Sequence, residues 1–280
     1  MPDDKLIWPA RLHHLNLTSE DPQPLVDWYS RALMMEPRGI AKGETWLRGK
    51  DRHLIISDGP KGGLKYAAYT LENEAQLIRL RNHIREKDIA VYPSPSPLME
   101  DSAFMIADPD GNQFVLGICR ETAVTPQMLP GRLQHVVFRT TDISRLVAFH
   151  SSILGFRVSD VVKEENGEVT ATFMRSDPEH HSLGIFRASE TGLDHFCSES
   201  TSWNDIRDWG DHFAGCQIPI TWGAGRHGAG NNLFIFVTDQ DGNNVEISAE
   251  IEHWTFEQEP REWLHEQRTL NLWGSAWLRS

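Results

Sequence analysis

Cysteine is scarce in this chain and follows no metal-binding spacing. The 280 residues contain three cysteines, Cys119, Cys197 and Cys216, an odd number without a CxxC pair. Neither a disulfide framework nor a zinc knuckle is therefore indicated. Long apolar runs are also missing, since no stretch approaches the roughly 20 apolar residues that span a bilayer. The first residues lack the basic and apolar segments of a secretory signal, so we expect a cytoplasmic protein with buried free thiols.

Positive charge is in short supply. The chain has 27 Lys and Arg against 40 Asp and Glu, a formal net charge of −13. Such a balance opposes nonspecific binding to nucleic acid phosphates and to anionic membrane surfaces. The hydrophobic fraction of 39% is that of an ordinary globular protein. A small molecule is thus a more plausible partner than a nucleic acid or a membrane.

The sequence contains an internal repeat. The segment RLHHLNLTSED from Arg11 matches RLQHVVFRTTD from Arg132, 121 residues later, and ADPDGNQFVLG from Ala107 matches TDQDGNNVEIS from Thr238. The match predicts two tandem modules, an N-terminal one over residues 1–125 and a C-terminal one over residues 126–280.

Each module shows the same order of periodicities. An alternating strand pattern precedes a helical one, several short strands follow, and a second helix leads to a final hairpin closed by Asp-Gly-Asn or a related turn. We therefore expect an α+β fold. Residues 251–280 have no counterpart in the first module and carry four of the ten tryptophans. Exposed aromatics at that density would be costly, so this tail is expected to cover a module or another subunit.

Three potential metal ligands fall on three separate predicted strands of the second module: His135, His195 and Glu246. The equivalent positions of the first module hold His14, Tyr66 and Val115. The first module therefore has one comparable ligand and is expected to be a vestigial copy. The second is expected to hold the complete set of ligands.

Two imidazoles and one carboxylate that leave coordination positions open are typical of mononuclear nonhaem Fe(II) oxygenases. The competing interpretation is a set of ordinary buried histidines, because a chain with thirteen histidines makes chance coincidences easy. Against it stands Glu246, since a carboxylate on an apolar strand costs several kcal/mol to bury unless it is paired or metal-bound.

The quoted repeat, together with LDHFCSE and GAGRHGAGNNLFIFVTDQDGNNVEIS, resembles the vicinal oxygen chelate superfamily, and specifically its two-module type I extradiol catechol dioxygenases. The resemblance covers about residues 10–250. It implies that each module is built from βαβββ units, that the modules form open barrels, and that the C-terminal module is the catalytic one. It further implies that Fe(II), or alternatively Mn(II), is held by His135, His195 and Glu246. A small aromatic diol and O2 would be the substrates, and the protein would be a homo-oligomer.

By the same resemblance, His181 occupies the position of an acid-base histidine. A neutral imidazole can accept a catechol proton and later return it. His180 lies on the opposite face of the strand in a regular alternation and is the less favoured candidate. It is retained as a substrate-binding residue, because a bulge could exchange the two.

His227 matches the position that hydrogen-bonds the substrate's oxygens, with a simple glycine-rich turn as the alternative. Trp222 and Phe186 are expected to form pocket walls. One position departs from the pattern: the family usually has a tyrosine ten residues before the carboxylate ligand, and this chain has Phe236. A hydrogen bond to a charged oxygen contributes about 1.5 to 3 kcal/mol, so Phe236 puts the substrate or the reaction in question.

The resulting hypothesis is a ring-cleaving extradiol dioxygenase. Two alternatives stay open at this point. A glyoxalase-like isomerase or an epimerase of the same superfamily would need a further protein ligand, which Tyr66 and Val115 do not offer. A noncatalytic protein that binds an aromatic or metal-chelating compound is mildly favoured by Phe236.

Overall fold

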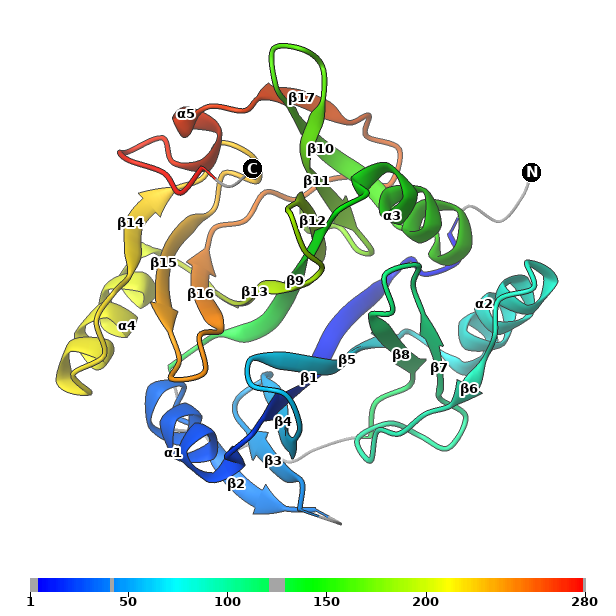
Figure 1. The fold of residues 1–280 in the computed structure, drawn as a ribbon, viewed down its shortest axis with the longest axis horizontal. Coiled ribbons are helices and arrows are strands. Elements are labelled where there is room, and N and C mark those ends of the chain that lie inside the picture. Colours follow the sequence, from blue (N-terminus) through cyan, green and yellow to red (C-terminus); the bar gives the residue numbers. More distant parts are fainter. Residues whose placement is uncertain (1–4, 41–42, 121–128, 279–280) are drawn as a thin grey trace.

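Two curved sheets, one from each half of the chain, lie side by side with the helices on their outer sides (Figure 1). The computed structural model describes residues 5–40, 43–120 and 129–278. No described helix is long and apolar enough to cross a membrane. The predicted α+β fold with two modules is confirmed.

The first module follows the predicted order of strand, helix, strands, helix and strands. Its elements are β1 (Ala10–Ser19), α1 (Pro22–Ala32), β2 (Glu36–Gly39), β3 (Thr45–Arg48), β4 (His53–Asp58), β5 (Gly63–Leu71), α2 (Glu74–Glu86), β6 (Tyr92–Pro93), β7 (Phe104–Ala107) and β8 (Gln113–Gly117).

The second module repeats this order and adds a C-terminal tail. Its elements are β9 (Arg132–Thr140), α3 (Ile143–Phe149), a π-helical turn (His150–Leu154), β10 (Arg157–Lys163), β11 (Val169–Arg175), β12 (Leu183–Arg187), β13 (Gly192–Ser200), α4 (Trp203–Gly215), β14 (Trp222–Arg226), β15 (Leu233–Thr238) and β16 (Asn244–Ala249). The tail contains β17 (Arg261–Leu264) and α5 (Gln267–Leu270).

The strand order is the same in both sheets. The first reads β2-β3-β4-β1-β5-β8-β7-β6 and the second reads β10-β11-β12-β9-β13-β16-β15-β14, with β17 added beside β10. The sequence predicted two strands after the second helix of each module, whereas the structure has three. The additional strands escaped prediction because β6 has only two residues and β14 contains two glycines, which have low strand propensity.

The Asp-Gly-Asn hairpin turns are held by the same bonds in both modules. In the second, Asp239 accepts the backbone N–H groups two and four residues later at 2.9 and 2.8 Å, and the side-chain amide of Asn243 at 2.8 Å. In the first, Asp108 accepts the corresponding three bonds at 2.9, 2.9 and 2.8 Å, the last from Asn112. An aspartate at the start of a turn stabilises it by this local bonding.

These turns also join the two modules. The hydroxyl of Tyr29 in α1 donates to Asp239 Oδ2 across the module boundary at 2.7 Å. In the opposite direction, His150 Nε2 lies 3.4 Å from Asp108 Oδ2. Tyr29 and His150 are themselves 121 residues apart, so the repeat generates two reciprocal contacts. Burial, and next the nearby Asp239 carboxylate, raise the pKa of Tyr29 well above its usual value, so the phenol remains a donor.

We predict that Tyr29→Phe lowers the free energy of unfolding by about 1.5 to 3 kcal/mol, because it removes a buried hydrogen bond to a carboxylate. Urea denaturation followed by fluorescence measures the change. Tyr92→Phe is the matched control, since Tyr92 is 51% exposed and its replacement should change stability by less than about 0.5 kcal/mol. Equal midpoints for the two variants would contradict the proposed anchoring role.

Candidate metal centre

The three predicted ligands lie on neighbouring strands of the second sheet, in the order β16, β13, β9. The Nε2 atom of His135 is 3.2 Å from Glu246 Oε2, and the Nε2 atom of His195 is 3.5 Å from the same oxygen. All three residues are buried, with Glu246 only 1% exposed. The side chains that the sequence singled out therefore converge.

The residue before each histidine fixes its tautomer. Asp194 Oδ1 lies 2.6 Å from His195 Nδ1, and Gln134 Oε1 lies 2.5 Å from His135 Nδ1. Because the amide of Gln134 donates to the carbonyl of His181, its oxygen is left as the acceptor. Both Nδ1 atoms must then carry a proton, and the lone pairs of the neutral rings lie on Nε2, beside Glu246. Partners of this kind commonly orient metal-binding histidines.

A third imidazole approaches Glu246 from the other side. His227 Nδ1 donates to the carbonyl of Leu270 at 2.5 Å, which leaves the lone pair on Nε2, 3.4 Å from Glu246 Oε1. Asn232 Nδ2 donates to the same oxygen at 3.2 Å, and its own Oδ1 is buried without a partner. Burial acts to raise the pKa of Glu246. The pKa lies well below its usual value only while His135 and His227 donate to the carboxylate as protonated rings, a role that a bound cation takes over when both rings are neutral.

This arrangement fits a bound cation. The carboxylate is ionised and buried, and within the described chain no Lys or Arg is bonded to it. Burial lowers the pKa of His135, which favours the neutral ring. Several nitrogen lone pairs therefore surround an anion with no compensating charge, a costly state without a cation. Imidazole nitrogens and a carboxylate oxygen are donors that suit first-row divalent metals.

Cys197 is a further residue close to the ligands, and its sequence context did not mark it as part of the site. Its Sγ, a ring nitrogen of His135 and a carboxylate oxygen of Glu246 all lie within 4.8 Å of one another. The thiol is 2.9 Å from the hydroxyl of Ser248, and burial raises its pKa well above the usual value. A protonated thiol is a poor ligand, so His195, whose ring is already oriented by Asp194, is the better third ligand.

His181 lies beside the three ligand candidates, with its ring centroid 4.3 Å from that of His135. Burial, and next the neighbouring His135, lower its pKa well below the usual value, so the ring is neutral and able to accept a proton. His180, retained above as a substrate-binding residue, is placed differently. It is fully buried behind His181, where its Nε2 is 2.8 Å from Asp160, and it does not line the cavity at the site.

Aromatic side chains enclose this cavity, which has a volume of about 40 Å³. The predicted residues Phe186, Trp222 and Phe236 all line it. Five further lining residues were not singled out from the sequence: Phe173, Ala229, Thr269, Leu270 and Trp277. Three of these belong to the C-terminal tail, which therefore covers its own module, one of the two placements expected from the sequence. Trp277 stacks on Trp222 with ring centroids 5.0 Å apart.

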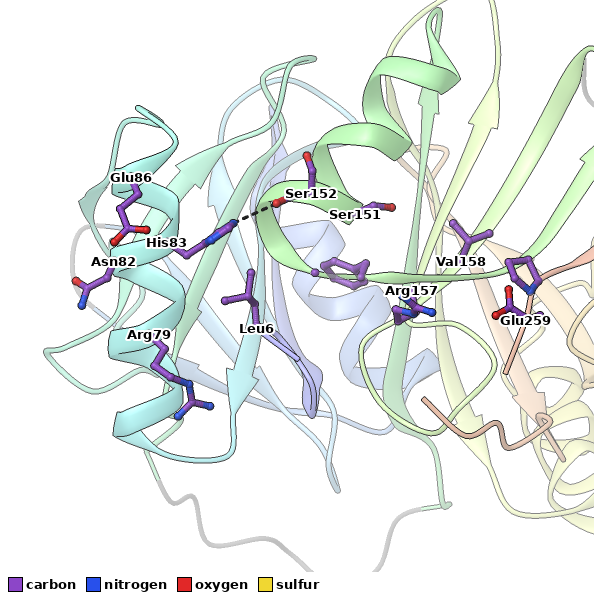
Figure 2. Close-up of a pocket in the computed structure, with 13 residues that line it drawn as sticks. Leu6, Arg79, Asn82, His83, Glu86, Ser151, Ser152, Arg157, Val158 and Glu259 are labelled. Carbon is purple, nitrogen blue, oxygen red and sulfur yellow. Dashed lines mark hydrogen bonds between the residues drawn. The ribbon is translucent and has the colours of Figure 1, made fainter. Parts of the chain in front are cut away.

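A larger groove of about 760 Å³ lies away from these histidines, between α2, the π-helical turn and β10 (Figure 2). Charged side chains of both signs line it, including Arg79, Glu86, Arg157 and Glu259. His83 contacts the carbonyl of Ser152 there at 3.1 Å. No convergent set of metal ligands is found among its lining residues, so the small aromatic cavity remains the candidate site.

The model of the Glyoxalase/Bleomycin resistance protein/Dioxygenase superfamily matches residues 11–116 and 132–247. The chain belongs to this superfamily. Metapyrocatechase 2 of Cupriavidus necator is 28% identical over 71% of this chain and 57% of its own length. An iron-dependent extradiol dioxygenase of Rhodococcus jostii is 22% identical over 86% of this chain and 88% of its own.

Among solved structures, homoprotocatechuate 2,3-dioxygenase of Arthrobacter globiformis aligns with a TM-score of 0.83 at 20% identity. The alignment covers 97% of this chain and 91% of that one. At this identity the likeness establishes the fold. The resemblance to two-module extradiol dioxygenases, inferred from the sequence, is confirmed by these comparisons.

We predict that Asp194→Asn weakens binding of a divalent metal about 10- to 100-fold, because the partner that orients His195 becomes a poorer acceptor. Anaerobic titration with Fe(II) or Co(II), read by calorimetry or absorbance, measures the affinity. Asp208→Asn, which alters an exposed carboxylate bonded to Arg207, should leave the affinity unchanged. Unchanged binding in the Asp194 variant would argue against His195 as a ligand.

Proposed function

We propose that the protein is an extradiol dioxygenase that opens a catechol-type ring at a mononuclear metal held by His135, His195 and Glu246. The observation that carries the proposal is the convergence of two imidazole Nε2 atoms on a buried carboxylate that has no Lys or Arg bonded to it in the described chain. The names of the relatives support the same chemistry. Fe(II) is the metal that we propose, with Mn(II) as the alternative.

In the overall reaction, both atoms of O2 are incorporated, and the ring bond beside the two diol carbons is broken to give a muconic semialdehyde. When bound, the metal supplies open coordination positions and a redox centre for O2. The side chains of the protein position the substrate and move its protons. The aromatic walls hold the ring and exclude water, which strengthens electrostatic interactions inside the cavity.

His181 is the proposed proton acceptor. Its neutral ring lines the cavity beside His135, at a place where it can take a proton from a diol hydroxyl and later return it. His227 also lines the cavity, and its Nε2 atom faces inward while its Nδ1 is bonded to Leu270. It is proposed to form a hydrogen bond with a substrate oxygen. Phe236 contributes an apolar ring surface in place of the family's tyrosine hydroxyl.

We predict that protein reconstituted anaerobically with Fe(II) consumes O2 and forms a yellow ring-opened product when a catechol and air are added. His181→Ala should retain the metal but lower kcat about 10²- to 10⁴-fold, the usual contribution of a general acid-base group. Glu246→Ala should lose metal and activity together. No O2 uptake by the wild-type protein across a panel of uncharged catechols would refute the dioxygenase assignment.

The residues that line the cavity predict which substituents the ring carries. Among the described lining residues there is no Lys or Arg, and most are aromatic or aliphatic. A carboxylate attached directly to the ring would lose its hydration without gaining a charged partner, at a cost of several kcal/mol. The proposed substrate is therefore a catechol with an uncharged, apolar substituent.

We predict that 3-methylcatechol is cleaved with a kcat/KM at least about 100-fold higher than 2,3-dihydroxybenzoate, which carries a carboxylate at the same ring position. Initial rates of O2 uptake over a range of concentrations give both values. Unsubstituted catechol serves as the reference for the ring itself. A preference for the carboxylated compound would show that a cation reaches the cavity in the active protein.

A further inference from the structure

A buried chain of hydrogen bonds leads away from His181 on the side opposite the cavity. The Nδ1 atom of His181 lies 2.9 Å from the Nδ1 atom of His180, and the Nε2 atom of His180 lies 2.8 Å from Asp160 Oδ2. His180 and Asp160 are fully buried, and His181 is 3% exposed. Three titratable side chains, His181, His180 and Asp160, are thus joined one after another by hydrogen bonds and shielded from water.

Arg261 ends the chain and fixes the charge of Asp160. Its Nε and Nη2 atoms donate to the two oxygens of Asp160, both at 2.8 Å, and Nη2 also donates to Glu252 at 2.8 Å. A bidentate guanidinium pair of this kind keeps a carboxylate ionised. Asp160 is therefore an acceptor only and cannot supply a proton to His180.

For a neutral His180, the position of every proton along the chain then follows. Since Asp160 only accepts, His180 Nε2 carries the proton of that bond. A neutral His180 has its lone pair on Nδ1, so the proton between the two rings belongs to His181 Nδ1. The lone pair of His181 is consequently on Nε2, the nitrogen that does not face His180.

We infer that Asp160 and His180, held in place by Arg261, position His181 and keep it in the tautomer that accepts a proton at Nε2. This inference rests on the proposed function for the role of His181, whereas the tautomer itself follows from the hydrogen bonds of a neutral His180. Asp160 and His180 are positioning residues, since neither lines the cavity. The arrangement resembles the role of the buried aspartate in a serine protease triad, with a second imidazole between carboxylate and base.

The chain also connects His181 to the C-terminal tail. Arg261 belongs to β17, which pairs in parallel with β10 so that Arg261 is the register partner of Asp160. The guanidinium lies 4.7 Å from the ring centroid of Trp254 and 5.5 Å from that of Trp263. Four contacts to fixed partners therefore hold Arg261, although its side chain is 37% exposed.

The decisive test compares Asp160→Asn in two backgrounds. In the Fe(II)-reconstituted protein with 3-methylcatechol, Asp160→Asn should lower kcat about 100-fold, with KM and metal content little changed. In the His181→Ala background the same substitution should lower kcat less than about threefold, because the residue through which it acts is gone. An equal loss in both backgrounds would overturn the inference, since it would reveal a general structural effect.

A second measurement is independent of ring cleavage. Long-range ¹⁵N–¹H spectra of the Zn(II)-loaded wild-type protein should show Nδ1–H on His181 and Nε2–H on His180. Observation of Nε2–H on neutral His181 would overturn the inference even in an active enzyme. If the wild-type protein showed the expected tautomers but consumed no O2, the proposed function would fail while the assignment of the hydrogen-bonded chain would stand.

Two controls protect this test against misfolding. Arg261→Gln retains Asp160 and removes the charged partner, so it should give a smaller loss of kcat in the same direction. Asp208→Asn alters an exposed carboxylate remote from the chain and should leave kcat unchanged. Far-UV circular dichroism and thermal melting of each variant identify any that do not fold, and for these the tautomer spectra of the wild-type protein decide the outcome.

Discussion

A buried carboxylate without a matching positive charge governs the arrangement of side chains around the candidate metal centre. Glu246 lies in β16, between β15 and β13, and is surrounded by imidazoles whose partners turn their lone pairs toward it. Aromatic walls exclude water from the same space, which makes an uncompensated charge more costly. The residues around Glu246 are therefore mutually consistent only when a cation completes them. The orientation of the histidines and the choice of ligands both follow from that one requirement.

The first module shows that the fold does not depend on this site. It has the same strand order and the same turn at Asp108, yet the position of Glu246 is taken by Val115. Val115 and Tyr66 belong to a cluster of buried apolar side chains in this module. His14 survives there, but its Nε2 contacts the hydroxyl of Ser96 at 2.7 Å. Apolar packing and the hydrogen bonds of the turn stabilise the fold of the module, whereas the capacity to bind a metal depends on a few side chains that differ between the two copies.

Comparison of the two copies made much of the fold and the three candidate ligands predictable from sequence. The apolar residues of a strand repeat with period two and those of a helix with period 3.6, so a duplicated order of strands and helices can be recognised. Against that repeat, Glu246 is conspicuous because the equivalent position of the first module holds Val115. Gln134 and Asp194 could have been noticed as polar residues directly before each candidate ligand. Asn232, Leu270 and Trp277 could not, because Asn232 reaches Glu246, and the other two reach the cavity, through tertiary contacts that no local period encodes. His180 was assigned to the substrate, and only its long-range partner Asp160 places it behind His181.

The C-terminal tail joins several parts of the site that the duplicated modules alone do not supply. Its strand β17 brings Arg261 to Asp160, and thereby to the hydrogen-bonded chain behind His181. Further along, the carbonyl of Leu270 accepts a hydrogen bond from His227 Nδ1, and Trp277 stacks on Trp222 at the wall of the cavity. At about 40 Å³ the enclosed cavity is far smaller than the roughly 300 Å³ or more of typical ligand pockets. Entry of a ring therefore requires wall side chains to move, and those on the tail are attached to the same segment that fixes His227 and Asp160. Displacement of the tail by substrate would act on the cavity wall, on His227 and, through Asp160, on His181. This segment is therefore the part of the chain where substrate fit and proton transfer can be coupled.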